Sequence, residues 1–102
     1  MNPADPRILA ALAELREEYA RELPHLFVTL ATAVSTLRAH PDAVTDAKGM
    51  AHRLRGTAGS YGFLAVSEAA AQLETALVAP LNWGEVEPAI EAVRVAIPAA
   101  EG

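Results

Sequence analysis

The sequence contains no cysteine, which excludes disulfide bonds, thiolate catalysis and cysteine-ligated zinc or iron–sulfur sites. Aromatic residues make up only 5% of the chain, and acidic residues outnumber basic ones, giving a net charge of −5. A general nucleic-acid binder would instead carry a basic stripe. No apolar run approaches the ~20 residues that span a bilayer, and no signal-peptide pattern is visible at the start. We therefore expect a cytoplasmic protein that binds neither nucleic acid nor membrane.

Apolar residues, by contrast, are abundant, because hydrophobic types make up 52% of the sequence and alanine is the most frequent of them. Alanine is the best helix former, and few β-branched or aromatic runs compete with it. With 102 residues the chain has the size of one small domain, too short for a two-domain enzyme with its own nucleotide fold. We expect a single all-α domain over residues 1–102, with a core at about 5–98.

The apolar residues recur every three or four positions, which is typical of amphipathic helices. The expected helices span about 6–22, 24–39, 43–61 and 64–79, followed by a fifth apolar stripe over 83–97. Asp5 before Pro6 is a helix-start signal, and Asp42 is a plausible N-cap of the third helix. Pro24 should interrupt the first segment or join two helices into one bent rod. Short connections predict antiparallel neighbours in a bundle.

One segment, residues 49–59, does not fit a plain bundle. It places three glycines inside the third helix, and each costs about 1 kcal/mol relative to alanine. At about 100° per residue, His52 points roughly 130° away from the core-facing stripe of this helix, and so toward solvent. Gly49, Gly56 and Gly59 share its face, and Lys48 and Arg55 lie along one edge of that face. An exposed imidazole is therefore expected among bare backbone and beside two cations.

This pattern has a chemical interpretation. A neutral imidazole is a nucleophile near pH 7, and flanking cations suit a dianionic group such as a phosphoryl. Glycine neighbours let the surface of a partner come close to the ring. The sequence contains no glycine-rich phosphate loop of the GxxxxGK[ST] type. If a phosphoryl group is the ligand, it must come from another protein and leave to another protein.

The run from His52 to Gly62, HRLRGTAGSYG, resembles the signature of histidine-containing phosphotransfer (HPt) domains, H-x-L-[KR]-G-x-A-x-x-x-G. Every specified position matches, with Arg55 in the slot usually held by lysine. The resemblance covers about residues 5–98. It implies an antiparallel four-helix bundle with an additional N-terminal helix.

The resemblance also implies roles for individual residues. His52 would accept a phosphoryl group on Nε2 from the aspartate of one response-regulator receiver domain and pass it to another. Arg55 would stabilise the phosphoryl oxygens, Gly56 would permit close approach, and Gly59 with Gly62 would shape the turn into the next helix. Further candidates are Lys48 and Gly59 for docking the receiver, and Glu74, with Gln72 as the fallback, for a hydrogen bond to the ring.

The same resemblance implies a carrier and not an autonomous enzyme. It implies no cofactor of its own, no metal site, and Mg²⁺ supplied by the receiver. A hybrid histidine kinase is the expected upstream partner. We expect a monomer, although an exposed apolar patch on the first two helices could change that.

Two other interpretations remain open at this point. The chain could be a phosphoacceptor module of a larger hybrid or chemotaxis kinase, labelled from ATP bound elsewhere. It could also be a bundle that binds and regulates a receiver or kinase without carrying phosphate. Proteins of that last kind typically lack the histidine, so His52 argues against it.

Overall fold

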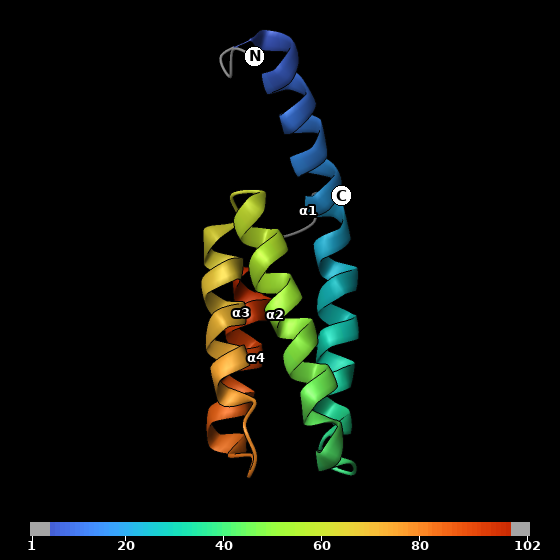
Figure 1. Cartoon of the computed structure of the whole chain (residues 1–102), viewed down its shortest axis with the longest axis vertical. Coiled ribbons are helices and arrows are strands. Elements are labelled where there is room, and N and C mark those ends of the chain that lie inside the picture. The colour runs from blue at the N-terminus through green and yellow to red at the C-terminus, as the bar shows by residue number, and fades with distance from the viewer. Residues whose placement is uncertain (1–4, 99–102) are drawn as a thin grey trace.

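The computed structural model describes residues 5–98, and this part of the chain forms four α-helices, one short 3₁₀ turn and no strand (Figure 1). The elements are α1 (Pro6–Thr36), η1 (Pro41–Ala43), α2 (Val44–Ser60), α3 (Leu64–Ala76) and α4 (Trp83–Ala96). The all-α helical bundle expected from the sequence is confirmed. None of the described helices combines the length and the apolar character needed to cross a membrane.

The first helix is a single element where two were expected. Asp5 caps its start, accepting a hydrogen bond from the Arg7 backbone N–H at 2.9 Å. The expected break at Pro24 is wrong, because α1 runs through it, so the alternative of one bent rod holds. Proline removes one N–H donor and crowds the preceding turn. Buried side chains on both sides of Pro24, from Leu23 to Leu30, hold the helix to the bundle and outweigh that cost.

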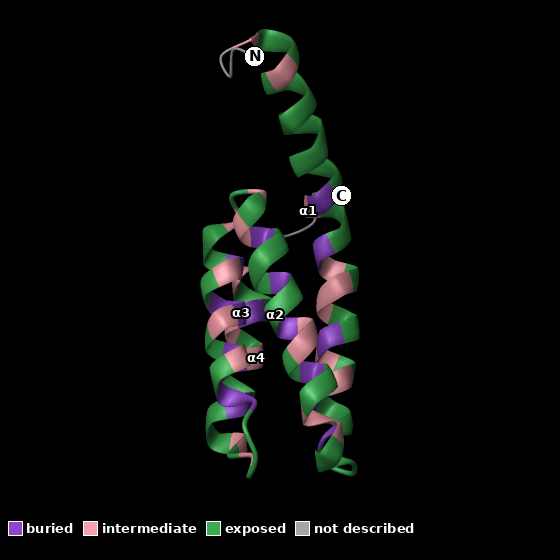
Figure 2. Ribbon diagram, viewed as in Figure 1, coloured by how far each residue is buried: buried purple, intermediate pink, exposed green. Residues whose placement is uncertain are grey.

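The two halves of α1 have different surroundings. From Tyr19 onward its inner face is buried at Tyr19, Leu23, Leu30 and Val34. Residues 6–18, which we call the projecting segment, have no buried residue and extend past the end of the bundle (Figure 2). The additional N-terminal helix expected from the sequence is therefore the first half of α1 and not a separate element.

The core of α2 is built from small residues. Ala47, Ala51, Leu54 and Ala58 are buried, as its apolar periodicity predicts, and the alanines let neighbouring helices come close. The N-cap expected at Asp42 is wrong: η1 comes first, and the N-cap of α2 is Ala43, without a side-chain hydrogen bond. Because the 3₁₀ turn at Pro41–Ala43 comes first, α2 begins at Val44, one residue later than expected.

The ends of α3 and α4 follow proline and cap chemistry. α3 stops at Ala76, three residues earlier than expected, and Ala79 precedes Pro80, a position that disfavours helix. α4 begins at Trp83, capped by the Asn82 side chain, which accepts from the Gly84 N–H at 3.0 Å. Pro88 lies inside α4 without ending it.

The turn between α2 and α3 sets how these helices face each other. Gly62 has φ of 83°, a left-handed conformation that favours glycine. The Phe63 N–H bonds the Ala58 carbonyl at 2.8 Å and the Gly62 N–H bonds the Gly59 carbonyl at 3.1 Å, which is a Schellman motif. The chain therefore reverses within three residues, and α3 packs antiparallel along α2.

Candidate functional site

His52 lies in the middle of α2, on the face opposite the buried alanines. Its side chain is 64% exposed, as the helical projection predicts. Ala51 and Leu54 on either side of it are buried, so the backbone that carries the imidazole is held by the core. The ring is thus presented to solvent from a rigid support.

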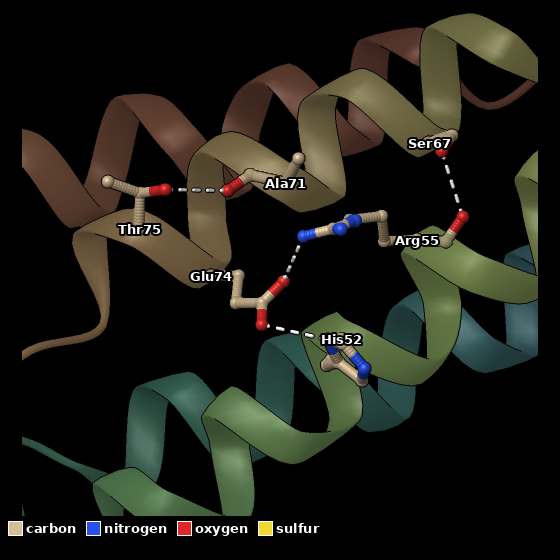
Figure 3. Close-up of polar contacts among 6 residues, drawn as sticks. All are labelled: His52, Arg55, Ser67, Ala71, Glu74 and Thr75. Carbon is tan, nitrogen blue, oxygen red and sulfur yellow. Dashed lines mark hydrogen bonds and ion pairs between the residues drawn. The ribbon is translucent and has the colours of Figure 1, made fainter.

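Glu74 of α3 is the partner of this ring. Its Oε2 lies 2.9 Å from His52 Nδ1, and its Oε1 accepts a hydrogen bond from Arg55 Nη1 at 3.0 Å (Figure 3). The Glu74 side chain is only 17% exposed, so one carboxylate bridges an exposed imidazole and an exposed guanidinium. His52 and Glu74 each lie eleven residues from Phe63, which places them level with each other on the two arms of the hairpin.

This contact selects the tautomer of the neutral ring. An ionised carboxylate can only accept a hydrogen bond, so the proton resides on Nδ1 and the lone pair on Nε2. Partial burial alone would raise the pKa of the Glu74 carboxyl. The hydrogen bond from His52, the positive charge of this ring when it is protonated and the Arg55 guanidinium oppose this and bring that pKa below its usual value. The carboxylate therefore stays ionised at neutral pH, and the free lone pair of the neutral ring lies on Nε2.

A second contact between α2 and α3 supports the first. Ser67 Oγ donates to the Arg55 carbonyl at 2.8 Å, next to the helical turn that carries His52 (Figure 3). A Cβ on Gly59 would stand 3.2 Å from that hydroxyl. Gly59 and Ser67 are each four residues from Phe63, so they face each other across the hairpin. The missing side chain of Gly59 thus makes room for Ser67.

The other candidate residues have different surroundings. Gly56 is exposed, and a Cβ placed there would have no atom within 4 Å, so the backbone beside Arg55 is open. Lys48 is exposed one turn before His52, and the ion pairs found in residues 5–98 do not include it. Gln72 is not brought to His52: it lines a shallow surface pocket with α4 residues Glu85 and Pro88. Residues two positions apart in a helix point about 200° away from each other, so Gln72 and Glu74 lie on different faces of α3.

Comparison with known protein families matches residues 14–100 to the Hpt domain. The chain belongs to the Hpt domain family. Searches of curated proteins and of solved structures found no match. The family match extends from the second half of the projecting segment through α4 and includes the whole His52 site. Members of this family are phosphocarrier modules of phosphorelays that interact with response-regulator receivers.

Within this Hpt domain, sequence reasoning missed Ser67. The sequence did contain a signal for it. Ser67 lies as many residues after the turn as Gly59 lies before it, so the two residues face each other across the hairpin. The described residues contain no group of three or more histidine, aspartate or glutamate side chains arranged to share a metal ion. The site itself presents one oriented imidazole beside a guanidinium.

Proposed function

We propose that this Hpt domain carries a phosphoryl group on His52 Nε2 between the aspartates of response-regulator receiver domains. The observation that supports it most is the Nδ1 contact with Glu74, because it leaves the Nε2 lone pair on the exposed ring. A scaffold that only binds a receiver would not need an oriented nucleophile. The proposed function also implies the cytoplasm as compartment and a hybrid histidine kinase upstream.

The transfer step follows from this geometry. The Nε2 lone pair attacks the phosphorus of the receiver's aspartyl phosphate, the N–P bond forms as the O–P bond breaks, and the aspartate leaves as a carboxylate. The ring, now substituted on Nε2 and protonated on Nδ1, carries a positive charge that the Glu74 carboxylate offsets. The reverse reaction with the aspartate of a second receiver returns the neutral ring.

Two neighbours of the ring would assist the step. Arg55 is held one turn after His52 by Glu74, and its half-exposed guanidinium can bond the phosphoryl oxygens. Gly56 leaves the backbone bare, so a receiver surface can come close. Lys48 adds a positive charge at the edge of the same face. The Mg²⁺ that the transfer uses would be held by the receiver.

The test is label transfer from a receiver that carries a labelled aspartyl phosphate. We expect the wild-type chain to take up the label as a phosphoramidate, stable in base and labile in acid, and His52→Gln to take up none. His25→Gln and His40→Gln, which change two other exposed histidines, are the matched controls and should label like the wild type. Equal labelling of wild type and His52→Gln would contradict the proposal.

The same assay distinguishes the proposed carrier from a phosphoacceptor module of a kinase and from a regulator that carries no phosphate. If an ATP-loaded histidine kinase domain labels His52 much faster than any phosphorylated receiver, the chain acts as the phosphoacceptor of a kinase. If the chain binds a receiver but no donor labels it, regulation without phosphate is the better description.

A further inference from the structure

Arg53, the residue after His52, is a cation of α2 that the proposed function leaves unused. Its side chain is exposed, and the ion pairs found within residues 5–98 do not include it. Two acidic residues lie on the same side of α2. Glu22 of α1 lines a groove together with Arg53, and Asp46 precedes Arg53 by two helical turns. Neither forms an ion pair with it, so a guanidinium without a counter-charge lies next to the phosphoacceptor.

Gly49 provides the place where this guanidinium lies. A Cβ added at Gly49 would stand 3.7 Å from Arg53 Nη1, so the Arg53 side chain runs back along α2 over bare backbone. Gly49 is three residues before His52 and about 60° from it around the helix. The guanidinium is therefore held close to the helix surface, beside the face that carries the imidazole. Of the three glycines in residues 49–59, this is the one for which phosphoryl transfer gives no reason.

Arg53 and Arg55 lie on different sides of the imidazole. Arg55 bonds Glu74 of α3, so it has a partner within the chain. Arg53 points about 160° away from Arg55 around the helix and lines the groove between α2 and α1, with Leu26 on the other wall. The α3 side of the site thus holds a paired arginine, and the α1 side holds an unpaired one.

We propose that Arg53 is a docking residue that binds an acidic side chain of the receiver on the α1 side of His52. The inference rests on the proposed function, since it needs a receiver placed over His52. A stable protein interface buries about 800 Å² on each partner, so a receiver centred on His52 also covers the adjacent Arg53. Covering an unpaired guanidinium removes its water, which weakens binding unless an anion replaces that water. A carboxylate can do so with two parallel hydrogen bonds.

The phosphoryl group fits this position less well than a carboxylate of the receiver. The Arg53 guanidinium lies over Gly49 on the α1 side, whereas the imidazole is bonded to Glu74 on the α3 side, where Arg55 is the nearer cation. A receiver carboxylate is present whether or not the receiver is phosphorylated. Contact with it therefore strengthens binding of both forms of the receiver, and contact with the phosphoryl group would strengthen binding of only one.

The test uses the receiver that labels the wild-type chain fastest or, if none labels it, the one that binds it most tightly. Arg53→Gln should raise the KM for phosphorylated receiver by about fivefold or more, and the Kd for unphosphorylated receiver by a similar factor. The kcat should stay within about twofold, because the ring and Arg55 are unchanged. Arg21→Gln is the matched control and should alter none of these constants. Arg21 is exposed and unpaired within residues 5–98, and it points about 160° away from the buried Tyr19.

Two further variants test the charge and the part played by Gly49. Arg53→Lys keeps the charge and should recover part of the affinity, and the effect of Arg53→Gln should shrink at high salt. Gly49→Leu should displace the guanidinium and raise the Kd about as much as Arg53→Gln, with little further effect when the two are combined. Additive effects would mean that the leucine itself meets the receiver, and would overturn the role given to Gly49. Circular dichroism of every variant shows whether the helices are retained.

The outcomes separate the role of Arg53 from the proposed function. Normal labelling with unchanged KM and Kd in Arg53→Gln overturns the role of Arg53 alone. A fall in kcat, or weaker binding of the phosphorylated receiver only, also overturns it and assigns Arg53 to the phosphoryl group. A wild-type chain that no receiver labels contradicts the proposed function, and a receiver that still binds it tests Arg53 through the Kd. If no receiver binds, both are overturned.

Discussion

The two faces of α2 show how one helix serves two different purposes. One face carries Ala51, Leu54 and Ala58, all buried, and it packs the bundle. The other carries His52, Arg55 and Gly56, all exposed, and its contacts with α3 run through Glu74 and Ser67. Under the proposed function, the difference means that reactivity comes from orientation on a rigid support and not from burial. Changes on one face should therefore alter transfer, and changes on the other should alter stability.

The largest expected effect is that of His52→Gln on transfer. Without the Nε2 nucleophile the rate should fall below detection, at least about 10³-fold. The free energy of unfolding should change by less than about 0.5 kcal/mol, because the side chain is exposed. Label transfer and chemical denaturation of the same preparation measure the two quantities. A loss of stability matching the loss of transfer would remove the distinction between the faces.

Leu54→Ala is the opposite substitution, two residues away on the buried face. We expect the free energy of unfolding to fall by about 2–5 kcal/mol, because the change leaves a cavity in the core. Transfer per folded molecule, measured at a temperature where the variant is folded, should stay near the wild-type rate. A strong loss of transfer in fully folded Leu54→Ala would show that packing and chemistry are coupled.

Gly56→Leu tests the open backbone next to Arg55. Nothing lies within 4 Å of a Cβ at this position, so we expect no loss of stability. Transfer should slow by about tenfold or more, since the added side chain keeps the receiver from near-attack distance. Gly56→Ala, which adds only a methyl group, is the graded control and should slow transfer less. Unchanged kinetics in Gly56→Leu would count against close approach at this position.

Glu74 joins the exposed face of α2 to α3. Its charge makes the free energy of unfolding depend on pH. Because its pKa is lowered in the folded chain, the stability it adds is fully present above the usual value and is lost as pH falls through the lowered one. Unfolding free energies of wild type and Glu74→Gln should therefore converge only at pH values below 4.5, the ordinary pKa. Convergence already above that pH would contradict the lowered pKa. Chemical denaturation of both proteins at several pH values measures the difference between their unfolding free energies.

Two substitutions of Glu74 separate the contribution of its hydrogen bond to transfer from that of its charge. Glu74→Ala removes both and should slow transfer by about tenfold, while Glu74→Gln can still accept from Nδ1 and should slow it less. The two variants are compared in the label-transfer assay with one receiver. Equal rates in both would mean that only the charge matters.

The smallest expected effect separates two glycines of α2. Gly56→Ala should raise the free energy of unfolding by about 0.5–1 kcal/mol, because alanine is the better helix former and the site is open. Gly59→Ala should gain less, because its Cβ would press on the Ser67 hydroxyl that bonds the Arg55 carbonyl. Adding Ser67→Ala to Gly59→Ala removes that hydroxyl and relieves the contact. Identical gains for the two single variants would show that Ser67 shifts freely.

Much of the fold could be predicted from periodicity, since burial of Ala47, Ala51 and Ala58 is dictated by helical spacing. The continuity of α1 through Pro24 could not, because it depends on packing against residues far along the chain. The end of α3 and the start of α2 also differed by one to three residues, where turns near proline compete with helix.

The exposure of His52 was predicted correctly from a helical projection. The family resemblance already placed Glu74 ahead of Gln72. The physical reason is the hairpin register, which Gly62 sets and which places Glu74 level with His52. Ser67 was missed because its hydroxyl bonds the backbone carbonyl of Arg55, so no side chain in α2 marks its partner. Only its place opposite Gly59, equally far from the turn, could have indicated it. The overhang of the projecting segment likewise depends on where the bundle ends and not on the helix itself.

The central claim is that Glu74 holds the proton on Nδ1 and leaves Nε2 of His52 as the phosphoryl acceptor. Nitrogen NMR of the ¹⁵N-labelled histidine rings, before and after phosphorylation by a receiver, tests it most directly. The account predicts an Nδ1–H tautomer for neutral His52 and, after transfer, coupling of phosphorus to its Nε2. An Nε2–H tautomer in the free protein, or phosphorus on Nδ1 or on another histidine, would contradict it.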